Sequence, residues 1–540
     1  MGDMANVDRG SRAKQIFTSD IRVDELEPCE MPTEQHGKKQ GHVSAIRKHF
    51  AAVMWCIYML WCVLANNYAK TAGQSVLGIP QFRKDFGSAF DGNYVLSTAW
   101  QSAYYGAPQA AAVMGALSAA WIADKMGRRI GLALIFSIRI ISITLEYIST
   151  TNGIFFAGRF LGGFATGGTN SLCMAYIGEI TPLALRGVLT AAVPISLITG
   201  ALSSALVVNF TGNQATRWAY RIAFVSGYGF MAIAAFILPF MPESPWWLVS
   251  HGKPEKAMAT LKRIGYSRSS DAENMIAEIK RVLAKTEEET SGATYIECFR
   301  RSNLRRTIIA AMPLTIQTFS GVAFIGSYST YYQQLAGYST ADSFKLFIVQ
   351  QILSGAGNVC AWFLVDRVGR RNLTLWGMIV LTTVLLITGG LAVSATPAAI
   401  RGTIALIQVF AFVYNATIGA SAFTILTEIP TARLRAKTAS LSVGLQSALT
   451  VRTMWGFVLP YLFNPDKANL GAKVTFIFGA LSVLSIVYLW LFLPESAGLS
   501  YERLDELFIG RVKTTKFMDR RRMSDSTLGR PLGEKPDMIA

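Results

Sequence analysis

The sequence predicts an all-α membrane protein with twelve transmembrane helices in two pseudo-symmetric six-helix halves. Hydrophobic residues make up 51% of the 540 residues and charged residues only 16%, and the mean hydropathy is +0.34. This composition is typical of a chain with many membrane spans and excludes a set of soluble domains. A charged turn, D-K-M-G-R-R from Asp124 to Arg129, recurs as D-R-V-G-R-R from Asp366 to Arg371. The recurrence indicates an internal duplication.

Each predicted span is an apolar run of about 20 residues, the length that crosses a hydrocarbon core. The runs lie at 51–73, 98–122, 130–149, 153–178, 187–209 and 220–241, then at 307–332, 344–365, 373–395, 402–427, 438–462 and 472–493. Low apolar content predicts a disordered tail, and amphipathic patterning predicts interfacial helices in the central loop. The expected organisation is a tail over 1–48, halves over 49–241 and 307–493, a helical loop over 242–306, and a basic tail over 494–540.

The net charge of +17 would suggest nucleic-acid binding in a soluble protein. Here the basic residues cluster in the turns that follow even-numbered spans, such as Lys125 to Arg129 and Arg433 to Lys437. Because basic loops stay in the cytoplasm, both termini and the central loop are expected there. We expect a monomer in the plasma membrane, with the lipid bilayer and a small solute as partners and no nucleic acid.

Few residues suggest chemistry. The six cysteines form no C-x-x-C pair and only four histidines are present, so no metal, cofactor or enzymatic site is expected. The sequon Asn209-Phe210-Thr211 is expected in the outer turn between spans five and six, where glycosylation of Asn209 is possible.

Acidic residues also recur at the predicted cytoplasmic helix ends. Glu179 and Arg186 in G-E-I-T-P-L-A-L-R-G have the same spacing as Glu428 and Arg435 in T-E-I-P-T-A-R-L-R-A-K. P-E-S follows each half, at Glu243 and Glu495. Acids and arginines at helix ends can form bidentate ion pairs, and we expect these pairs to latch the two halves together. The expected gating residues are Asp124, Arg128, Arg129, Glu179, Arg186, Glu243, Asp366, Arg370, Arg371, Glu428, Arg435 and Glu495.

Together, D-K-M-G-R-R, G-R-F-L-G-G, G-E-I-T-P-L-A-L-R-G, P-E-S-P-W-W-L, V-D-R-V-G-R-R and L-P-E-S-A-G-L-S resemble the sugar porter family of the major facilitator superfamily. The predicted seventh span and the turn T-A-R-L-R-A-K-T are most similar to the fungal maltose and general α-glucoside permeases. The resemblance implies a solute site near the membrane midplane and alternating access by rocking of the halves. It also implies that Arg159, in G-R-F-L-G-G, joins the cytoplasmic latch with Glu179 and Glu243.

The resemblance further implies a sugar site of polar side chains, because each hydroxyl taken from water needs a new hydrogen bond. Gln317 matches the family's sugar-binding glutamine, Ser354 falls at a position that is often polar, and Gln101 is polar beside Trp100. Asn415 and Phe423 replace the glutamate and tryptophan that are common in hexose carriers. The polar set is thinned elsewhere, since Pro194, Ala323 and Leu449 fall where amides are usual.

The first predicted span departs from the family at the proton-coupling position. It contains N-N-Y-A, from Asn66 to Ala69, where the α-glucoside symporters resemble E-G-Y-D. Neither Asn66 nor Ala69 can carry a proton, which leaves facilitated diffusion or coupling through another acid. Lys70 and Arg452 are cations within apolar runs, where an unpaired charge costs about 3 kcal/mol or more. Either cation could pair with a nearby acid, Lys70 could reach the outer surface, or both could face the cavity and favour an anionic solute.

These observations predict a transporter of a small polar solute, a sugar or α-glucoside, with impaired proton coupling. An alternative keeps the fold and changes the cargo to a non-sugar metabolite, such as an anionic fungal secondary metabolite, moved in either direction. A second alternative is a non-transporting sugar sensor. The expected substrate-contacting residues are Gln317, Ser354, Gln101, Asn66, Lys70, Asn415, Phe423 and Arg452.

Overall fold

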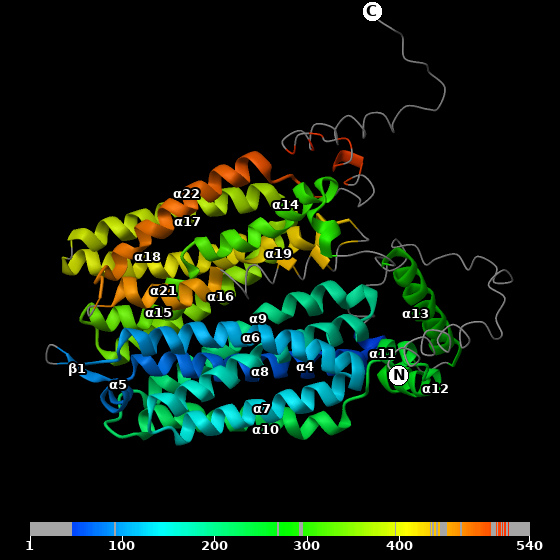
Figure 1. Ribbon diagram of the computed structural model, residues 1–540, viewed down its shortest axis with the longest axis horizontal. Coiled ribbons are helices and arrows are strands. Elements are labelled where there is room, and N and C mark those ends of the chain that lie inside the picture. Colours follow the sequence, from blue (N-terminus) through cyan, green and yellow to red (C-terminus); the bar gives the residue numbers. More distant parts are fainter. Residues whose placement is uncertain are drawn as a thin grey trace, which may run out of the picture.

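The computed structural model describes residues 46–90, 93–266, 269–290, 295–394, 396–431, 434, 437–438, 441–442, 451–464 and 467–497, with a few residues between 504 and 517. The expected N-terminal tail lies almost wholly outside these residues, as do most of the C-terminal tail, Arg433 and Arg435. The helices form two bundles that lie one above the other in Figure 1, the first half in blue through cyan to blue-green and the second in green through yellow to orange.

The first half consists of six long helices. They are α4 (Phe50–Ser75), α6 (Thr98–Met126), α7 (Arg128–Ile148), α8 (Asn152–Ile180), α9 (Leu183–Thr211) and α10 (Trp218–Ile237). Between α4 and α6 the chain forms the 3-10 turn η2 (Val76–Gly78), α5 (Pro80–Phe86) and an antiparallel hairpin of β1 (Ser88–Phe90) and β2 (Asn93–Val95), with Ser88 opposite Val95. We call this end of the molecule the hairpin end.

The second half repeats the plan with two interrupted helices. It contains α14 (Arg301–Phe319), α15 (Val322–Leu335), α16 (Thr340–Val368), α17 (Arg370–Ser394), α18 (Pro397–Ala416), α19 (Ile418–Glu428), α21 (Val451–Phe463), the 3-10 turn η7 (Gly471–Val474) and α22 (Thr475–Phe492). α14 and α15 together form one span, as do α18 and α19. α14 begins at Arg301, before the boundary expected at 307, because the helix extends beyond its apolar part.

Nine helical stretches in the described residues are long and apolar enough to cross a membrane. α6, α8 and α21 fill the other three positions of the twelve-helix plan. The low hydropathy of α6 and α8 has a physical reason, because the two helices pack closely against each other rather than only against lipid. A Cβ atom on Gly167 of α8 would lie 1.7 Å from the carbonyl oxygen of Ala112 of α6. Such close approach requires small residues, which are less hydrophobic than leucine or isoleucine.

The chain between the halves contains the 3-10 turn η3 (Leu238–Phe240), α11 (Pro245–Ser250), α12 (Pro254–Ile264), α13 (Ser269–Thr290) and the 3-10 turn η4 (Tyr295–Phe299). α11, α12 and α13 pack around a hydrophobic cluster that includes Trp247, Leu261 and Ile276. Their apolar faces are therefore buried against one another, and the expectation of interfacial helices is wrong in this respect. Figure 1 shows them at the end of the molecule opposite the hairpin, which we call the loop-helix end.

Candidate functional site

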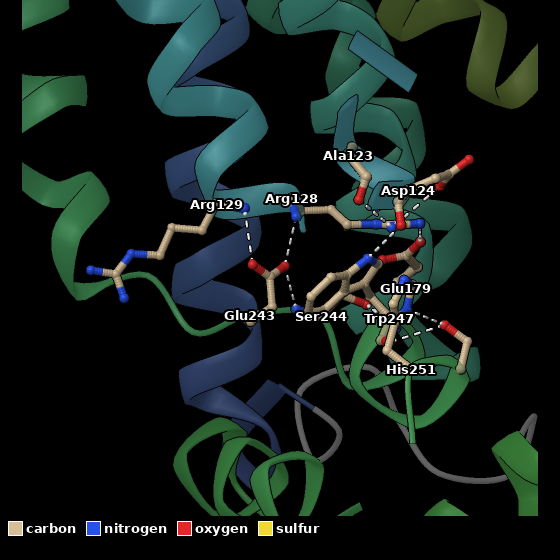
Figure 2. A network of polar contacts seen from close by, with 10 residues as sticks. Ala123, Asp124, Arg128, Arg129, Glu179, Glu243, Ser244, Trp247 and His251 are labelled. Atoms are coloured by element: carbon tan, nitrogen blue, oxygen red, sulfur yellow. Dashed lines mark hydrogen bonds and ion pairs between the residues drawn. The ribbon is translucent and has the colours of Figure 1, made fainter. Parts of the chain in front are cut away.

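The carboxylate of Glu243 holds the start of α7 in the first half. Its oxygens accept hydrogen bonds from the backbone N–H groups of Arg128, at 2.8 Å, and Arg129, at 3.2 Å (Figure 2). Unpaired N–H groups and the helix dipole favour an anion at this position. The carboxylate can approach because Gly127 has no side chain, since a Cβ atom there would lie 2.5 Å from Glu243 Oε2. Gly127 also has φ +96° and ψ 162°, a region that only glycine occupies readily.

The Arg128 side chain adds an ion-pair network to this capped turn. Its guanidinium lies 2.8 Å from Glu179 at the end of α8 and 3.4 Å from Asp124, and it donates to the Ala123 carbonyl oxygen at 3.1 Å. The Arg129 side chain is exposed and extends away from these groups (Figure 2). Although the two arginines are adjacent in sequence, Arg128 contributes its side chain as well as its backbone N–H group, whereas Arg129 contributes its backbone N–H group.

The second half repeats this arrangement. Glu495, which is buried, accepts hydrogen bonds from the backbone N–H groups of Arg370, at 2.9 Å, and Arg371, at 3.1 Å. The Arg370 guanidinium contacts Glu428 Oε1 through Nε at 3.2 Å and through Nη2 at 3.1 Å. Gly369, with φ +88° and ψ 157°, takes the place of Gly127. The sequence duplication is therefore also a duplication of structure.

The expected latch between the halves is not what these residues form. The pairs Arg128–Glu179 and Arg370–Glu428 each join helices within one half. The expectation that they bridge the halves is wrong for this conformation, because each acid lies on a helix neighbouring its arginine in the same bundle. Three expected gating residues lie outside the part of the chain that the structure describes. They are Arg186 and Asp366, whose side chains are not described, and the whole of Arg435.

We expect Arg128→Gln to lower the stability of the folded protein and Arg129→Gln to leave it nearly unchanged. Both variants remove one positive charge from the same turn, but only the first removes side-chain bonds to Glu179 and Ala123. A hydrogen bond to a charged group contributes about 1.5 kcal/mol or more when it is shielded from water. Melting temperatures of the two purified variants would show the difference. Equal losses would contradict the division of roles between Arg128 and Arg129.

The halves contact each other through polar and aromatic groups at the hairpin end. Tyr105 of α6 donates to the Ser327 carbonyl oxygen of α15 at 2.9 Å and packs against Tyr328 at 4.4 Å between ring centroids. Gln334 of α15 accepts from Arg83 at 2.9 Å and donates to the Gly78 carbonyl oxygen at 2.7 Å. These contacts join the two halves at the hairpin end.

The side chain of Gln317 on α14 forms hydrogen bonds with the backbone of the second interrupted helix, which consists of α18 and α19. Its amide nitrogen donates to the carbonyl oxygens of Ile418, at 2.8 Å, and Gly419, at 3.2 Å. These residues lie beside Thr417, whose φ −121° and ψ −101° separate α18 from α19. Carbonyls freed by a helix break inside a membrane need donors. Gln317 therefore stabilises the break from the neighbouring span.

The structure places the remaining expected contact residues at different depths. Ser354 is buried on α16, and Asn415 on α18 is half-buried and donates to the Ala411 carbonyl oxygen at 2.9 Å. Phe423 on α19 is exposed. Gln101 is buried between the halves near Tyr105, and its amide nitrogen donates to the Leu96 carbonyl oxygen at 2.9 Å.

The expected position of the sequon is wrong. Asn209 lies in the last turn of α9, which continues to Thr211, and is half-buried. The turn expected around it begins only after this helix. The reason is that the polar residues Asn209 and Thr211 continue the helix, and the Thr211 hydroxyl donates to the Val207 carbonyl oxygen at 3.1 Å.

Asn66 belongs to a buried polar network that the sequence analysis did not identify. Its side-chain oxygen accepts from Arg139 Nε of α7 at 2.8 Å and also from Arg139 Nη2. Its amide nitrogen donates to Thr169 of α8 at 2.5 Å, and Arg139 also donates to Thr166 at 2.5 Å. Asn66 and Arg139 are buried, so in this conformation Asn66 joins α4, α7 and α8. The signal available in the sequence was an arginine in the middle of a predicted span.

Arg159 occupies a different place from the one expected. It is buried on α8, 3.6 Å from Glu146 of α7, and it donates to the Lys70 carbonyl oxygen at 3.3 Å. Glu179 lies near the opposite end of α8, and at a rise of about 1.5 Å per residue the two cannot meet. The expectation that Arg159 contacts Glu179 and Glu243 is therefore wrong. Glu146, which the sequence analysis missed, is its partner.

Lys70 and Arg452 lie on helices of opposite halves. Lys70 is half-buried on α4 and interacts electrostatically with Arg452 of α21, as well as with Arg159 and Arg139. Arg452 also interacts with Tyr414 of α18. The side chain of Arg452 is exposed.

Two similar six-helix halves, interrupted helices in the second half and a polar centre between them define a secondary transporter with the major facilitator fold. Residues 51–508 match the Sugar (and other) transporter family, and the chain belongs to that family.

The chain is similar to characterised members of this group. It is 27% identical over 505 residues to the general alpha-glucoside permease of Saccharomyces cerevisiae, covering 92% of this chain and 82% of that protein. It is 29% identical over 484 residues to the maltose permease MAL31 of the same yeast, covering 88% and 78% of the two chains. The inward open structure of the xylose transporter XylE from Escherichia coli has a TM-score of 0.69 at 19% identity and covers 84% of this chain and 99% of that one.

Proposed function

We propose that this protein moves a small hydroxyl-bearing solute of the sugar or α-glucoside class across a membrane by alternating access. The observation that carries the proposal is that contacts within each half and contacts between the halves lie at opposite ends of the molecule. Each half is stabilised internally at the loop-helix end by Arg128–Glu179 or Arg370–Glu428, whereas Tyr105, Gln334 and Arg83 join the halves at the hairpin end. Two rigid halves can then rock about a central site while the contacts between them change.

The polar centre supports a hydrophilic solute. Gln317 and Asn415 lie beside the break in the second interrupted helix, and backbone groups at such breaks commonly contribute to solute sites. The matching relatives are named as permeases of α-glucosides and maltose, which favours a sugar-like cargo. The basic turns favour a cytoplasmic loop-helix end, and we place the protein in the plasma membrane with both termini inside.

Proton coupling through the first span is not expected. α4 carries Asn66 and Ala69 where a proton-carrying acid would lie, and it contains no aspartate or glutamate. Glu146 is the buried carboxylate nearest this region, and it faces Arg159 and Arg139. Its ion pair with Arg159 of α8 engages it within the first half. We therefore propose that the solute moves down its own gradient.

We expect uptake of the solute to be insensitive to a protonophore and nearly equal at acidic and neutral external pH. The measurement is uptake of labelled sugars by yeast that lacks its own hexose and maltose carriers and expresses the full chain at its surface. Ala69→Asp introduces a carboxylate on α4, and we expect that variant to acquire stimulation at acidic pH. Steep acid stimulation of the unchanged protein would refute uncoupled transport. A surface-located protein that moved no solute would contradict the proposed function itself.

A further inference from the structure

The helix α5 is fixed to the first half by contacts near its C-terminal end. The Asp85 carboxylate accepts a hydrogen bond from the Tyr220 hydroxyl of α10 at 2.9 Å. Asn152, at the start of α8, donates to the Phe86 carbonyl oxygen at 3.1 Å. The Phe86 ring also packs against Tyr220, at 6.1 Å between ring centroids. When the halves move relative to each other, α5 is therefore expected to move with the first half.

Arg83 of the same helix reaches across to the second half. Its Nη2 atom donates to Gln334 Oε1 of α15 at 2.9 Å, and Gln334 Nε2 donates to the Gly78 carbonyl oxygen at 2.7 Å. The Arg83 guanidinium also lies 5.7 Å from the ring centroid of Tyr331, about one turn earlier on α15. A single amide of the second half thus bonds to two groups of the first half. We call Arg83, Gln334 and the Gly78 carbonyl oxygen the clasp.

The clasp borders the space between the halves. Arg83 lines one cavity there, and Gly78 lines a second. Leu77, Tyr105 and Tyr331 line both cavities, so the two cavities are adjacent. Because the clasp joins the two halves beside these cavities, separating the halves at the hairpin end requires its hydrogen bonds to break.

The strength of the clasp suits a contact that forms and breaks repeatedly. A hydrogen bond to a charged group such as the Arg83 guanidinium shifts an equilibrium by a factor of about ten or more, and a neutral hydrogen bond by about fivefold. Breaking a buried ion pair would shift it by on the order of 100-fold or more. A solute can shift a conformational equilibrium only as far as its affinities for the two states differ. A neutral amide at Gln334 therefore keeps opening within reach of a weakly bound solute.

We propose that the clasp is the outer gate contact of the transporter, and that Arg83 and Gln334 set how often the hairpin end opens. This inference rests on the proposed transport function and assigns residues to one step of it. That function places the hairpin end outside, so its opening exposes the space between the halves to the external solution. Breaking the clasp raises the fraction of protein that is open there, whereas fixing it covalently stops alternation between the two states.

The first experiment measures how often the hairpin end opens. Thr71 is buried and lines the second cavity, so Thr71→Cys places a thiol between the halves of the full chain. Carrier-deficient yeast that expresses this protein is treated with a membrane-impermeant thiol reagent, and the protein without the added cysteine is the blank. We expect Gln334→Ala and Arg83→Gln each to accelerate labelling of the added cysteine about tenfold or more, since each removes the hydrogen bond to the guanidinium.

Arg217→Gln is the matched control for the labelling experiment. Arg217 is exposed and lies 3.4 Å from Asp85 within the first half, so this substitution removes one arginine charge from the hairpin end and leaves the clasp in place. Exposed ion pairs contribute little, and labelling should stay at the parent rate. Equal acceleration by Arg83→Gln and Arg217→Gln, or no acceleration by Gln334→Ala, would overturn the assignment of the clasp.

The second experiment fixes the clasp covalently. Arg83→Cys and Gln334→Cys are combined and joined by a bifunctional thiol reagent that a reductant cleaves, and uptake of labelled glucose and maltose is measured. We expect joining to stop uptake almost completely and the reductant to restore it. Gln81→Cys with Arg217→Cys is the control pair, because both native side chains contact Asp85 within the first half, at 2.9 Å and 3.4 Å. A link between them leaves the halves free to move.

The outcomes separate the clasp from the transport function. Uptake that continues after Arg83→Cys and Gln334→Cys have been joined would overturn the clasp and leave the transport function intact. Faster labelling in Gln334→Ala, in a surface-located protein that takes up neither sugar, would support the clasp and contradict the proposed function.

Discussion

Gly127→Ala is expected to destabilise the first half and to abolish most transport. The added Cβ atom would lie 2.5 Å from Glu243 Oε2, so Glu243 must withdraw from the backbone N–H groups of Arg128 and Arg129. The alanine would also have to adopt φ +96° and ψ 162°, a conformation that costs about 1–3 kcal/mol for a residue with a side chain. Loss of the helix cap adds about 1 kcal/mol.

The measurements are the melting temperature of the purified protein and uptake by cells with equal surface expression. Gly369→Ala should behave in the same way, since its Cβ atom would lie 2.6 Å from Glu495 Oε2. Gly153→Ala in the first turn of α8 is the matched control, because a Cβ atom there meets no other atom within 4 Å. Wild-type stability and uptake of Gly127→Ala would show that the capped turn is not required.

Asn66→Leu is the second substitution with a large expected effect. Leucine has a similar branched shape, although it is larger, and it cannot accept hydrogen bonds, so the buried guanidinium of Arg139 would lose the acceptor that receives its Nε and Nη2 protons. Breaking a buried charged interaction by removing one partner typically costs about 3–5 kcal/mol. We expect poor expression of folded protein and a strongly lowered melting temperature.

Two further variants test this explanation. Asn67→Leu is the neighbouring control, since the Asn67 side chain is half-buried and donates to one backbone carbonyl oxygen, that of Leu197, at 2.6 Å; its expected cost is about 1 kcal/mol. Asn66→Asp retains an acceptor beside Arg139 and should fold well. If Asn66→Leu melts no lower than Asn67→Leu, the Arg139 network does not contribute to stability as the structure indicates.

The two repeated charged turns show how much of the arrangement of the expected gating residues could be predicted from sequence. Residue order alone identified Gly127 with Gly369 and Glu243 with Glu495, because a capped turn requires those residue types and each half contains one. The order did not reveal that the Arg128 and Arg370 pairs lie within the halves. An ion pair depends on which helices are neighbours, and that arrangement is absent from a linear motif.

The buried centre was less predictable. Asn66 was interpreted as a cavity residue because its position in the first span matched a coupling acid. In the structure α4 packs against α7 and α8, and the Asn66 side chain contacts Arg139. Arg159 was assigned to the latch from its motif, although its distance along α8 from Glu179 already excluded that contact. Whether a polar side chain in an apolar helix faces the pathway or a neighbouring helix depends on helix rotation, which hydropathy does not specify.

The amino-acid order was sufficient for the twelve-span plan and the duplicated charged turn, because spans and repeats depend on local chemistry and on the bilayer. The structure then showed that Glu243 caps this turn through backbone N–H groups. Tertiary packing alone decided the partners of the charged side chains. It paired Glu146 with Arg159 and placed the Arg139 guanidinium in hydrogen-bonding contact with Asn66. Charges in a low-dielectric interior interact most strongly over short distances, so their roles follow from spatial neighbours rather than from sequence neighbours.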